Sequence, residues 1–477
     1  MSAIDLGLGL VRLNPADNVY VSLANTAERQ MGHKYACHQL EIGDFVLKYG
    51  VQIGEITEKV EPGEHVHTHN LRPLEGGSKR QFITLDSGAL LPSTGSILYY
   101  KNPMTGKMAT ARNILIISAV ACVNRVVSEI ARRFDSNEYG SGSVNVIGLQ
   151  HSFGCGHVAG SDDLDTLRRV IDGYSRNPNT FYCVVIGLGC EDNQVKEWGE
   201  FSEFDYYQIQ DMTEERLVAE VEARIANKIV EFNKLNPILA GVEHLTVGLQ
   251  CGGSDGLSSV TANLLLGYFS TALIDAGATV ILSETPEVAG FEDFLVGLCR
   301  SEDGSRKLNS IFEDWVKRGN GAANPAPGNY SGGISNHFEK SIGSVLKFGF
   351  NEIVDVLEYA EQSKVHKGAV FMDSPGYDPC SVTGQISAGA NAIIFTTGRG
   401  SNYTNSFLPV LKIGSNPDVS SKHSFIDVDA FSLLRDFETS ESVNKLFHEL
   451  VQKINCFGMD RSSRHSDFIP WIKGGVN

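Results

Sequence analysis

The chain has 477 residues, and its 40 lysines and arginines against 57 aspartates and glutamates give a formal net charge of −17. The length fits about three domains with ample cores. The negative charge argues against nucleic acids and anionic membranes as partners, because phosphate binding is driven by Lys and Arg. No apolar run approaches the roughly 20 residues that span a bilayer. We expect no secretory signal, because the first residues lack a basic segment followed by an apolar one.

The nine cysteines are dispersed and odd in number. This favours a reduced, cytoplasmic protein over a disulfide framework. Glycine is enriched, at 49 of 477 residues, against an average of roughly 7%. Because glycine lets the main chain approach a ligand closely, the places where glycines gather are informative.

Residues 1–72 have the pattern of a small β-rich domain. Short β-prone segments at 18–22, 44–48 and 52–56 are separated by Gly, Asp and Pro. Residues 73–110 are less regular, with clusters of Gly, Pro, Ser and Lys, and we interpret them as a linker.

From residue 111 onward, apolar runs alternate with longer amphipathic stretches such as 213–235 and 258–276. The runs are rich in Val and Ile and mostly apolar throughout, as in strands buried on both faces of a parallel sheet. They cover residues 114–120, 144–149, 181–188, 245–249, 279–283, 369–372 and 392–396. This alternation predicts an α/β body with largely parallel sheets. We divide it into domains at 111–240 and 241–477.

Reactive side chains follow six of these runs. In open α/β sheets, ligands bind beyond the carboxyl ends of the strands. A single loop of this kind is more often a solvated turn, but six together favour one shared site. The side chains in these loops include His151, Cys155, Cys190, Cys251, Glu284, Asp373 and Arg399.

The loop at 251–256 is rich in glycine and leads toward the predicted helix at 258–276. A helix N-terminus offers free N–H groups and a positive dipole end to an anion. We find no GxxxxGK[ST] and no convincing GxGxxG, so we expect a carboxylate and not a nucleotide phosphate. Arg399 offers a planar fork to a carboxylate, the alternative being a structural salt bridge. The predicted substrate-binding residues are Gly252, Gly253, Ser254, Asp255 and Arg399.

His65, His67 and His69 occupy alternate positions. On a strand their imidazoles would share one face. Imidazole binds Fe, Zn, Ni or Cu, and a zinc finger is excluded because no CxxC pair accompanies them. We predict that these three residues bind a metal or transfer protons, the alternative being a polar edge strand.

Eight segments, in order over nearly the whole chain, resemble the altronate/galactarate dehydratase family of sugar-acid hydro-lyases. GLQCGGSDG and FTTGRG are the most specific parts. The segments are GEHVHTHN (63–70), HSFGCG (151–156), IGLGCEDNQV (186–195), GLQCGGSDGLSSVTAN (248–263), ETPE (284–287), NPAPGNYSGG (324–333), EKSIGS (339–344) and FTTGRGS (395–401).

The resemblance implies a small N-terminal SAF domain with a β-clip fold, joined to a two-part α/β catalytic body. It also implies Fe(II), sometimes replaced by Mn(II), and dehydration of an altronate- or galactarate-type acid to a 2-keto-3-deoxy acid. In such a reaction a metal chelates the carboxylate and a general acid protonates the leaving hydroxyl.

On this basis we predict roles for the loop residues. The predicted catalytic residues are His65, His67, His69, His151 and Glu284. The predicted metal ligands are His67, His69, Cys155, Cys190 and Cys251. Two alternatives stay open. Cys155, Cys190 and Cys251 can instead hold an iron–sulfur cluster, which the resemblance disfavours. Glu284 can instead be a helix cap or a surface carboxylate.

Two other functions fit the same residues. One is C–S lyase chemistry on sulfolactate, which a related branch carries out with the same body. The other is non-catalytic binding of a sugar acid, which needs no thiols. The fusion of the SAF domain to the body favours sugar acids over sulfolactate. Tyr330 stands where relatives often have Lys, which leaves the exact substrate open, and the sequence also leaves open a homo-oligomer.

Overall fold

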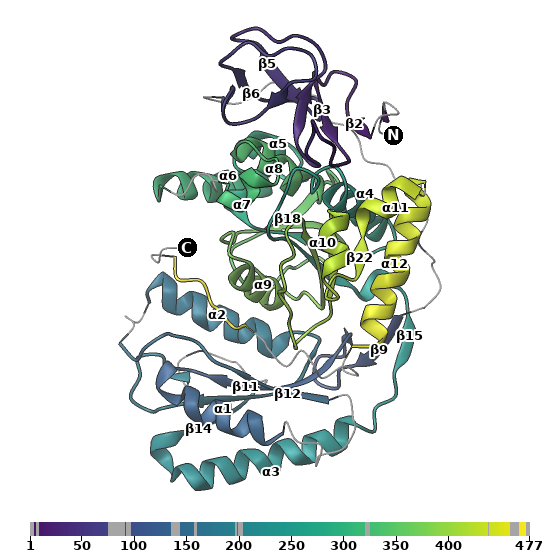
Figure 1. Ribbon diagram of the computed structural model, residues 1–477. Coiled ribbons are helices and arrows are strands. Elements are labelled where there is room, and N and C mark those ends of the chain that lie inside the picture. Colours follow the sequence, from purple (N-terminus) through teal and green to yellow (C-terminus); the bar gives the residue numbers. More distant parts are fainter. Residues whose placement is uncertain are drawn as a thin grey trace.

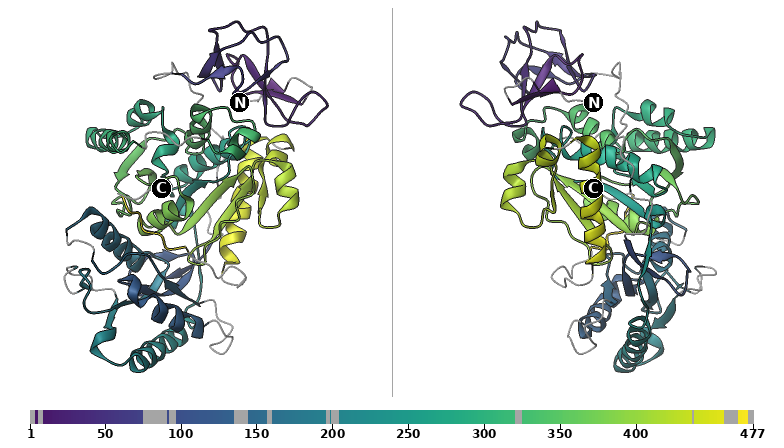
Figure 2. Two further views of the ribbon diagram at one scale, coloured as in Figure 1. Left: turned by 60° about the vertical axis from the view of Figure 1, so that its left-hand side comes forward. Right: turned by 90° about the vertical axis from the view of Figure 1, so that its right-hand side faces the viewer.

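The computed structural model describes residues 4–5, 9–74, 91, 97–134, 144–156, 160–195, 198, 204–319, 325–436, 438–457 and 467–473. Its fold class is the predicted one: antiparallel β sheets at the N-terminus and an α/β body with two parallel sheets. The N-terminal β domain and the domain with the four-stranded sheet lie at opposite ends of the molecule, with the seven-stranded sheet between them (Figures 1 and 2).

Two antiparallel sheets of short strands form the N-terminal domain. The first contains, in spatial order, β1 (Ile4–Asp5), β2 (Leu10–Arg12), β3 (Val19–Ser22), β4 (Lys34–Ala36) and β7 (His65–Val66). The second contains β5 (Phe45–Lys48), β6 (Val51–Ile56) and β8 (Leu71–Arg72). The three β-prone segments predicted from the sequence are β3, β5 and β6.

The next domain is built on a four-stranded parallel sheet, and its strand β13 is buried at every position. In spatial order the strands are β12 (Val144–Leu149), β11 (Arg112–Ser118), β13 (Thr180–Gly187) and β14 (Asp205–Gln208). The accompanying helices and 3-10 turns are η1 (Ala121–Val123), α1 (Asn124–Arg133), α2 (Asp162–Arg176), η4 (Ile209–Asp211), α3 (Glu214–Phe232) and η5 (Val242–His244). A small antiparallel sheet contains β10 (Met108–Ala109), β9 (Ile97–Lys101) and β15 (Ile238–Ala240).

The C-terminal domain contains seven strands that all pair in parallel. Their spatial order is β18 (Ile353–Leu357), β19 (Gly368–Met372), β17 (Thr279–Leu282), β16 (Thr246–Cys251), β20 (Ala392–Thr397), β21 (Val410–Gly414) and β22 (Val428–Asp429). The helices and one 3-10 turn are α4 (Ala262–Asp275), η6 (Thr285–Val288), α5 (Glu292–Gly297), α6 (Glu302–Lys317), α7 (Pro327–Ser331), α8 (His337–Leu346), α9 (Asp378–Ser387), α10 (Pro417–Lys422), α11 (Ala430–Asp436) and α12 (Thr439–Asn455).

The helix predicted at 258–276 begins later than expected, at Ala262. The Ser258 hydroxyl forms two hydrogen bonds with Asp255. It donates to Asp255 Oδ1 at 2.9 Å and accepts from the Asp255 N–H at 3.0 Å. Side chains of this kind compete with helix formation by bonding to nearby backbone groups. The glycine-rich loop therefore ends in a separate turn before α4, and not at the helix N-terminus.

The N-terminal domain contacts the C-terminal domain through main chain that only glycine permits. A Cβ at Gly256 would lie 1.9 Å from the carbonyl oxygen of Gly32, and one at Gly333 would lie 2.5 Å from the same oxygen. The two domains are therefore in backbone contact beside the loop that follows β16. Within the described part of the chain, every helix is too short or too polar to cross a membrane.

Candidate active site

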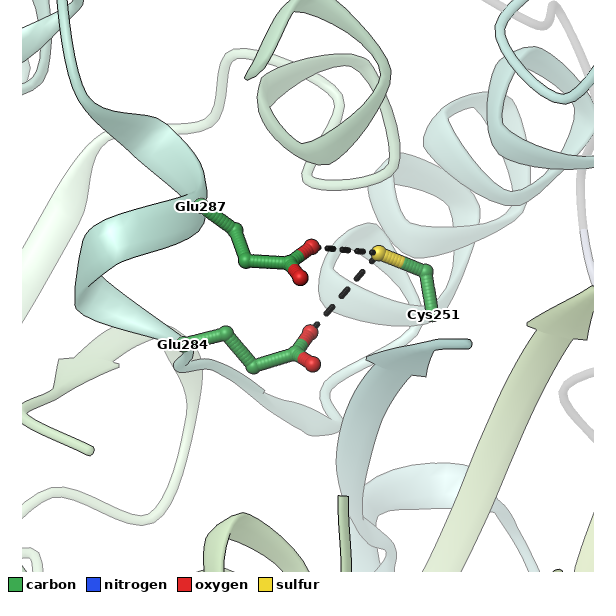
Figure 3. Close-up of side chains that lie close together, drawn as sticks. All are labelled: Cys251, Glu284 and Glu287. Carbon is green, nitrogen blue, oxygen red and sulfur yellow. Dashed lines mark hydrogen bonds between the residues drawn. The ribbon is translucent and has the colours of Figure 1, made fainter. Parts of the chain in front are cut away.

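A buried group of reactive side chains lies at the carboxyl edge of the seven-stranded sheet. Cys251 is the last residue of β16, Glu284 comes two residues after β17, and Glu287 lies in η6. Cys251 Sγ is 3.5 Å from Glu287 Oε2 and 3.8 Å from Glu284 Oε2 (Figure 3). Among the described residues, these three form the one group of His, Cys, Asp or Glu side chains with ligand atoms close enough to hold a metal ion.

Lys340 of α8 and Lys347, the residue directly after α8, form ion pairs with the two glutamates. Lys347 Nζ lies 2.5 Å from Glu284 Oε2 and 3.1 Å from Cys251 Sγ. Lys340 Nζ lies 2.8 Å from Glu287 Oε1. Because the two lysines are seven residues apart on a helix, they face the same side. The other oxygen of Glu284, Oε1, is buried and has no hydrogen-bond partner among the described residues, so it is available to bind a cation.

Burial perturbs the acids of this group. It raises the pKa of Glu284 to about 7, against the opposing effect of Lys347. It also raises the pKa of the Cys251 thiol, which favours the protonated thiol in the metal-free protein. Burial and the two glutamates together hold the pKa of Asp378, at the start of α9, well above its usual range. Glu284 itself is fully buried. This excludes the alternative that it is a carboxylate on the protein surface.

The backbone of Glu284 is left-handed, with φ 69° and ψ 58°. For a non-glycine residue this conformation costs about 1–3 kcal/mol. The turn leads directly into η6, which carries Glu287. The strained backbone of Glu284 thus lies at the turn that places the carboxylates of Glu284 and Glu287 beside the Cys251 thiol.

The predicted histidine group lies where the N-terminal domain meets α7. Strand β4 pairs with β7 so that Tyr35 is opposite His65, and one step further His33 faces His67. The ring centroids are 5.0 Å apart for His33 and His65, 5.3 Å for His65 and His67, and 5.6 Å for His65 and His69. The alternate spacing therefore does bring these imidazoles together, with His33 as a fourth member.

A buried ion triad joins the same domain to α8. Lys34 Nζ lies 2.7 Å from Glu339 Oε2, and Lys48 Nζ lies 2.5 Å from Glu339 Oε1. Burial alone would raise the pKa of Glu339, but the two lysines hold it well below its usual range. Burial lowers the pKa of Lys34 to about 8. The triad fixes β4, which pairs with the His65-bearing strand β7, against the C-terminal domain.

The loop after β16 uses most of its polar groups internally. Asp255 Oδ1 accepts from the hydroxyls of Ser258 and Ser415, each at 2.9 Å, and Asp255 Oδ2 accepts from the Asn416 amide at 3.3 Å. The Gly252 N–H donates to a carbonyl of β20 at 3.0 Å. These contacts give Asp255 and Gly252 structural roles, and the substrate contacts of both residues stay a prediction.

Arg399, in the loop after β20, is exposed to solvent. It lies beside Gly253, where an added Cβ would be 3.1 Å from the Cβ of Arg399. With the described residues its side chain forms no ion pair, which disfavours the structural salt bridge considered above. Ser254 is buried, and its carbonyl accepts from the Asn329 amide at 2.7 Å. Of the predicted substrate-binding side chains, Arg399 is therefore the one placed to meet an anion.

Three predicted site residues belong to the four-stranded domain instead. His151 is buried, with Nε2 bonded to the Ser118 carbonyl at 2.8 Å and Nδ1 accepting from the Phe153 N–H at 3.1 Å. Cys155 and Cys190 are exposed thiols. In the described ranges, neither cysteine belongs to a metal-binding group with Cys251. Within the described part of the chain, the three cysteines considered for an iron–sulfur cluster are thus not grouped, and Cys155 and Cys190 do not join Cys251 as ligands of one metal ion.

Sequence reasoning missed several members of the site. Two signals were available: ETPE places two glutamates three residues apart, and EKSIGS begins a stretch with an acid, Glu339, and a base, Lys340, on one helix. The missed residues are His33, Lys34, Lys48, Glu287, Glu339, Lys340, Lys347 and Asp378.

Fold and site together define an α/β protein with a buried thiol–carboxylate group and an N-terminal β domain packed against its body, and comparison with known proteins gives its family. Profiles match for the altronate/galactarate dehydratase SAF domain at 26–74, for the second domain of D-galactarate dehydratase/altronate hydrolase at 100–233, and for the D-galactarate/altronate dehydratase C-terminal domain at 242–474. The chain belongs to the altronate/galactarate dehydratase family, so the resemblance is confirmed.

Relatives match over most of the chain. Altronate dehydratase of Escherichia coli (strain K12) is 31% identical, over 98% of this chain and 99% of the relative. Altronate dehydratase of Bacillus subtilis (strain 168) is 30% identical, over 91% of this chain and 89% of the relative. Galactarate dehydratase (L-threo-forming) of Escherichia coli (strain K12) is 32% identical, over 59% and 58%. The similarity thus extends through the SAF domain and both parts of the body.

Proposed function

We propose that this protein is a metal-dependent hydro-lyase that dehydrates an aldonic or aldaric acid of the altronate or galactarate type to a 2-keto-3-deoxy acid. The observation that carries the proposal is the buried group of Cys251, Glu284 and Glu287 at the carboxyl edge of the parallel sheet. It belongs to a chain that is similar to altronate dehydratases over nearly its whole length.

The proposed reaction has two chemical obstacles. The proton at C2, next to the carboxylate, is weakly acidic, and hydroxide is a poor leaving group from C3. A positioned acid or base contributes roughly 10²–10⁴-fold to such a step. Electrostatic stabilisation of the negative charge that develops on the substrate carboxylate must supply much of the rest.

The donor set fits a divalent transition metal, for which we propose Fe(II), with Mn(II) as the alternative. Cys251, Glu284 and Glu287 would hold it, and the unpaired Glu284 Oε1 supports this fit. When bound, the metal supplies Lewis-acid chemistry toward the substrate carboxylate and an adjacent hydroxyl. A soft thiolate beside hard carboxylates suits iron better than magnesium or calcium.

The residues of the chain itself supply charge and orientation. Lys340 and Lys347 pair with Glu287 and Glu284 and fix the direction of both carboxylates. The open guanidinium of Arg399 is suited to the carboxylate of the acid. The SAF histidines offer nitrogen atoms for proton transfer. All nine cysteines are free thiols, which supports the further proposal that the enzyme acts in the cytoplasm.

A product assay tests the proposed function. Anaerobically purified protein, loaded with Fe(II), with Mn(II) or with no metal, is incubated with a panel of aldonic and aldaric acids and with sulfolactate. We expect a 2-keto-3-deoxy acid from a sugar acid, loss of activity with chelator, and recovery on adding metal. Sulfite as the product would show a C–S lyase instead. Tight binding without product would show a binding protein.

A further inference from the structure

The hydrogen bonds of the SAF histidines fix where their protons lie. A carbonyl oxygen can only accept, so a ring nitrogen bonded to one must carry the hydrogen. His67 Nε2 lies 3.1 Å from the Tyr330 carbonyl, and His33 Nε2 lies 3.4 Å from the Ser331 carbonyl. Both rings therefore present Nε2–H to α7. In a neutral ring the other nitrogen, Nδ1, is then an acceptor.

This assignment determines the state of His65. Its Nε2 lies 2.9 Å from His33 Nδ1, which must accept, so His65 Nε2 carries the hydrogen. His65 Nδ1 is then left with a bare lone pair and has no partner among the described residues. The His65 ring is half-buried and reachable. His67 differs, because its Nδ1 already accepts from the Thr68 hydroxyl at 3.0 Å.

The same contacts connect His65 to the buried group. His33 and His67 bond to the carbonyls of α7, and Asn329 of that helix donates to the Ser254 carbonyl at 2.7 Å. Ser254 lies three residues after Cys251, in the loop that also carries Gly253 beside Arg399. The His33–His65 pair is therefore connected, through α7, to the loop that follows Cys251.

We infer that His65 Nδ1 is the atom that accepts the C2 proton of the substrate and that His33 is the positioning residue that orients its ring. The inference rests on the proposed dehydration. It separates the three histidines of the HxHxH segment: His65 is the base and His67 is a structural contact to α7. In this arrangement His67 has no free nitrogen for the metal that we predicted it to bind.

The electrostatics support a neutral His65 before the reaction. Burial, together with His33, His67 and Lys34, lowers the pKa of His65 to about 3. Burial also lowers the pKa of His33, so its ring stays neutral and its Nδ1 stays an acceptor. A bound substrate carboxylate would raise the affinity of His65 for a proton at the moment when it is needed.

The proton and electrons balance in the proposed step. The C2–H bond breaks, and its proton goes to His65 Nδ1. Its electron pair forms the C2–C3 double bond, and the C3–O bond breaks with its pair on oxygen. The departing hydroxide takes one proton from solvent and becomes water, and the imidazolium, held through Nε2–H by His33, later returns one proton to solvent. The enol then tautomerises to the 2-keto-3-deoxy acid.

The test uses the full-length, metal-loaded enzyme with the acid it dehydrates best. His65→Asn keeps a polar side chain but has no basic nitrogen, so we expect kcat to fall by roughly 10²–10⁴-fold with KM little changed. In His65→Ala, added imidazole should restore part of kcat, which a structural role would not produce. His33→Asn should lower kcat less. The control is His38→Asn, an exposed histidine of the same domain.

Nearly unchanged kcat in His65→Asn, or no rescue of folded His65→Ala by imidazole, would overturn the assignment. A second measurement is independent of turnover: ¹⁵N NMR of the metal-free protein labelled at histidine should show hydrogen on Nε2 of His65 and none on Nδ1. Hydrogen on Nδ1 would also overturn it. A wild-type enzyme that dehydrates no sugar acid would contradict the proposed function instead, and the NMR result would then decide the proton assignment by itself.

Discussion

Glu339 and Lys340 are neighbours on α8, and their side chains contact different parts of the protein. Glu339 binds Lys34 and Lys48 of the SAF domain, whereas Lys340 binds Glu287 of the buried group. A single turn of helix therefore holds the histidine-bearing domain and one of the carboxylates of the candidate metal site. We therefore expect a change in the position of the SAF domain to move Lys340 and, with it, Glu287.

Glu339→Gln tests the strength of this connection. The variant leaves two buried ammonium groups without their carboxylate, and breaking one buried pair costs about 3–5 kcal/mol. We expect a loss of that size in the free energy of unfolding, measured by denaturant titration. Glu352→Gln removes an exposed partner of Arg300 and should cost no more than about 1 kcal/mol. Equal effects of the two variants would contradict the buried triad.

Lys347→Met tests the charge balance of the buried group. Lys347 lowers the pKa of Glu284, so its removal should raise that pKa above about 7. In the metal-free protein the infrared band of the protonated Glu284 carboxyl should then persist to higher pH than in the wild type. Glu284→Gln identifies the band by removing it. A band that titrates at the same pH in both proteins would show that Lys347 does not set the charge of Glu284.

The sequence located Cys251 and Glu284 because both stand directly after apolar strands of one sheet. The same local rule selected His151 and Cys155, which follow a strand of a different sheet. Local patterns show where strands end, but they do not show which strand ends share an edge, because that depends on strand order. Lys347 was missed for a similar reason: its place depends on how α8 packs across the sheet.

Acid should weaken the structure through the SAF histidines. Burial first, and neighbouring groups second, lower the pKa of His65 to about 3 and that of His67 to about 4, from an ordinary 6.5. Between the ordinary pKa of 6.5 and the lowered pKa of each histidine, the unfolded chain binds a proton that the folded chain does not. The free energy of unfolding therefore falls as the pH falls from 6.5 toward 4.

In the double variant His65→Asn, His67→Asn the free energy of unfolding should change less with pH between 6.5 and 4. Denaturant titrations at several pH values measure this. His366→Asn, at an exposed position in the C-terminal domain, serves as the control. A double variant with the slope of the wild type would mean that other groups cause the acid sensitivity.

Metal binding should depend on Cys251 and not on the other loop cysteines. Cys251→Ser replaces a soft thiolate donor by a hydroxyl within the group that contains Glu284 and Glu287. We expect its affinity for Fe(II) to fall at least tenfold, about 1.4 kcal/mol, in anaerobic titrations. The double variant Cys155→Ser, Cys190→Ser changes two exposed thiols and should bind Fe(II) like the wild type. If the double variant loses the metal, or the wild type has a broad violet-to-blue absorption band, the iron belongs to a cluster that includes those cysteines.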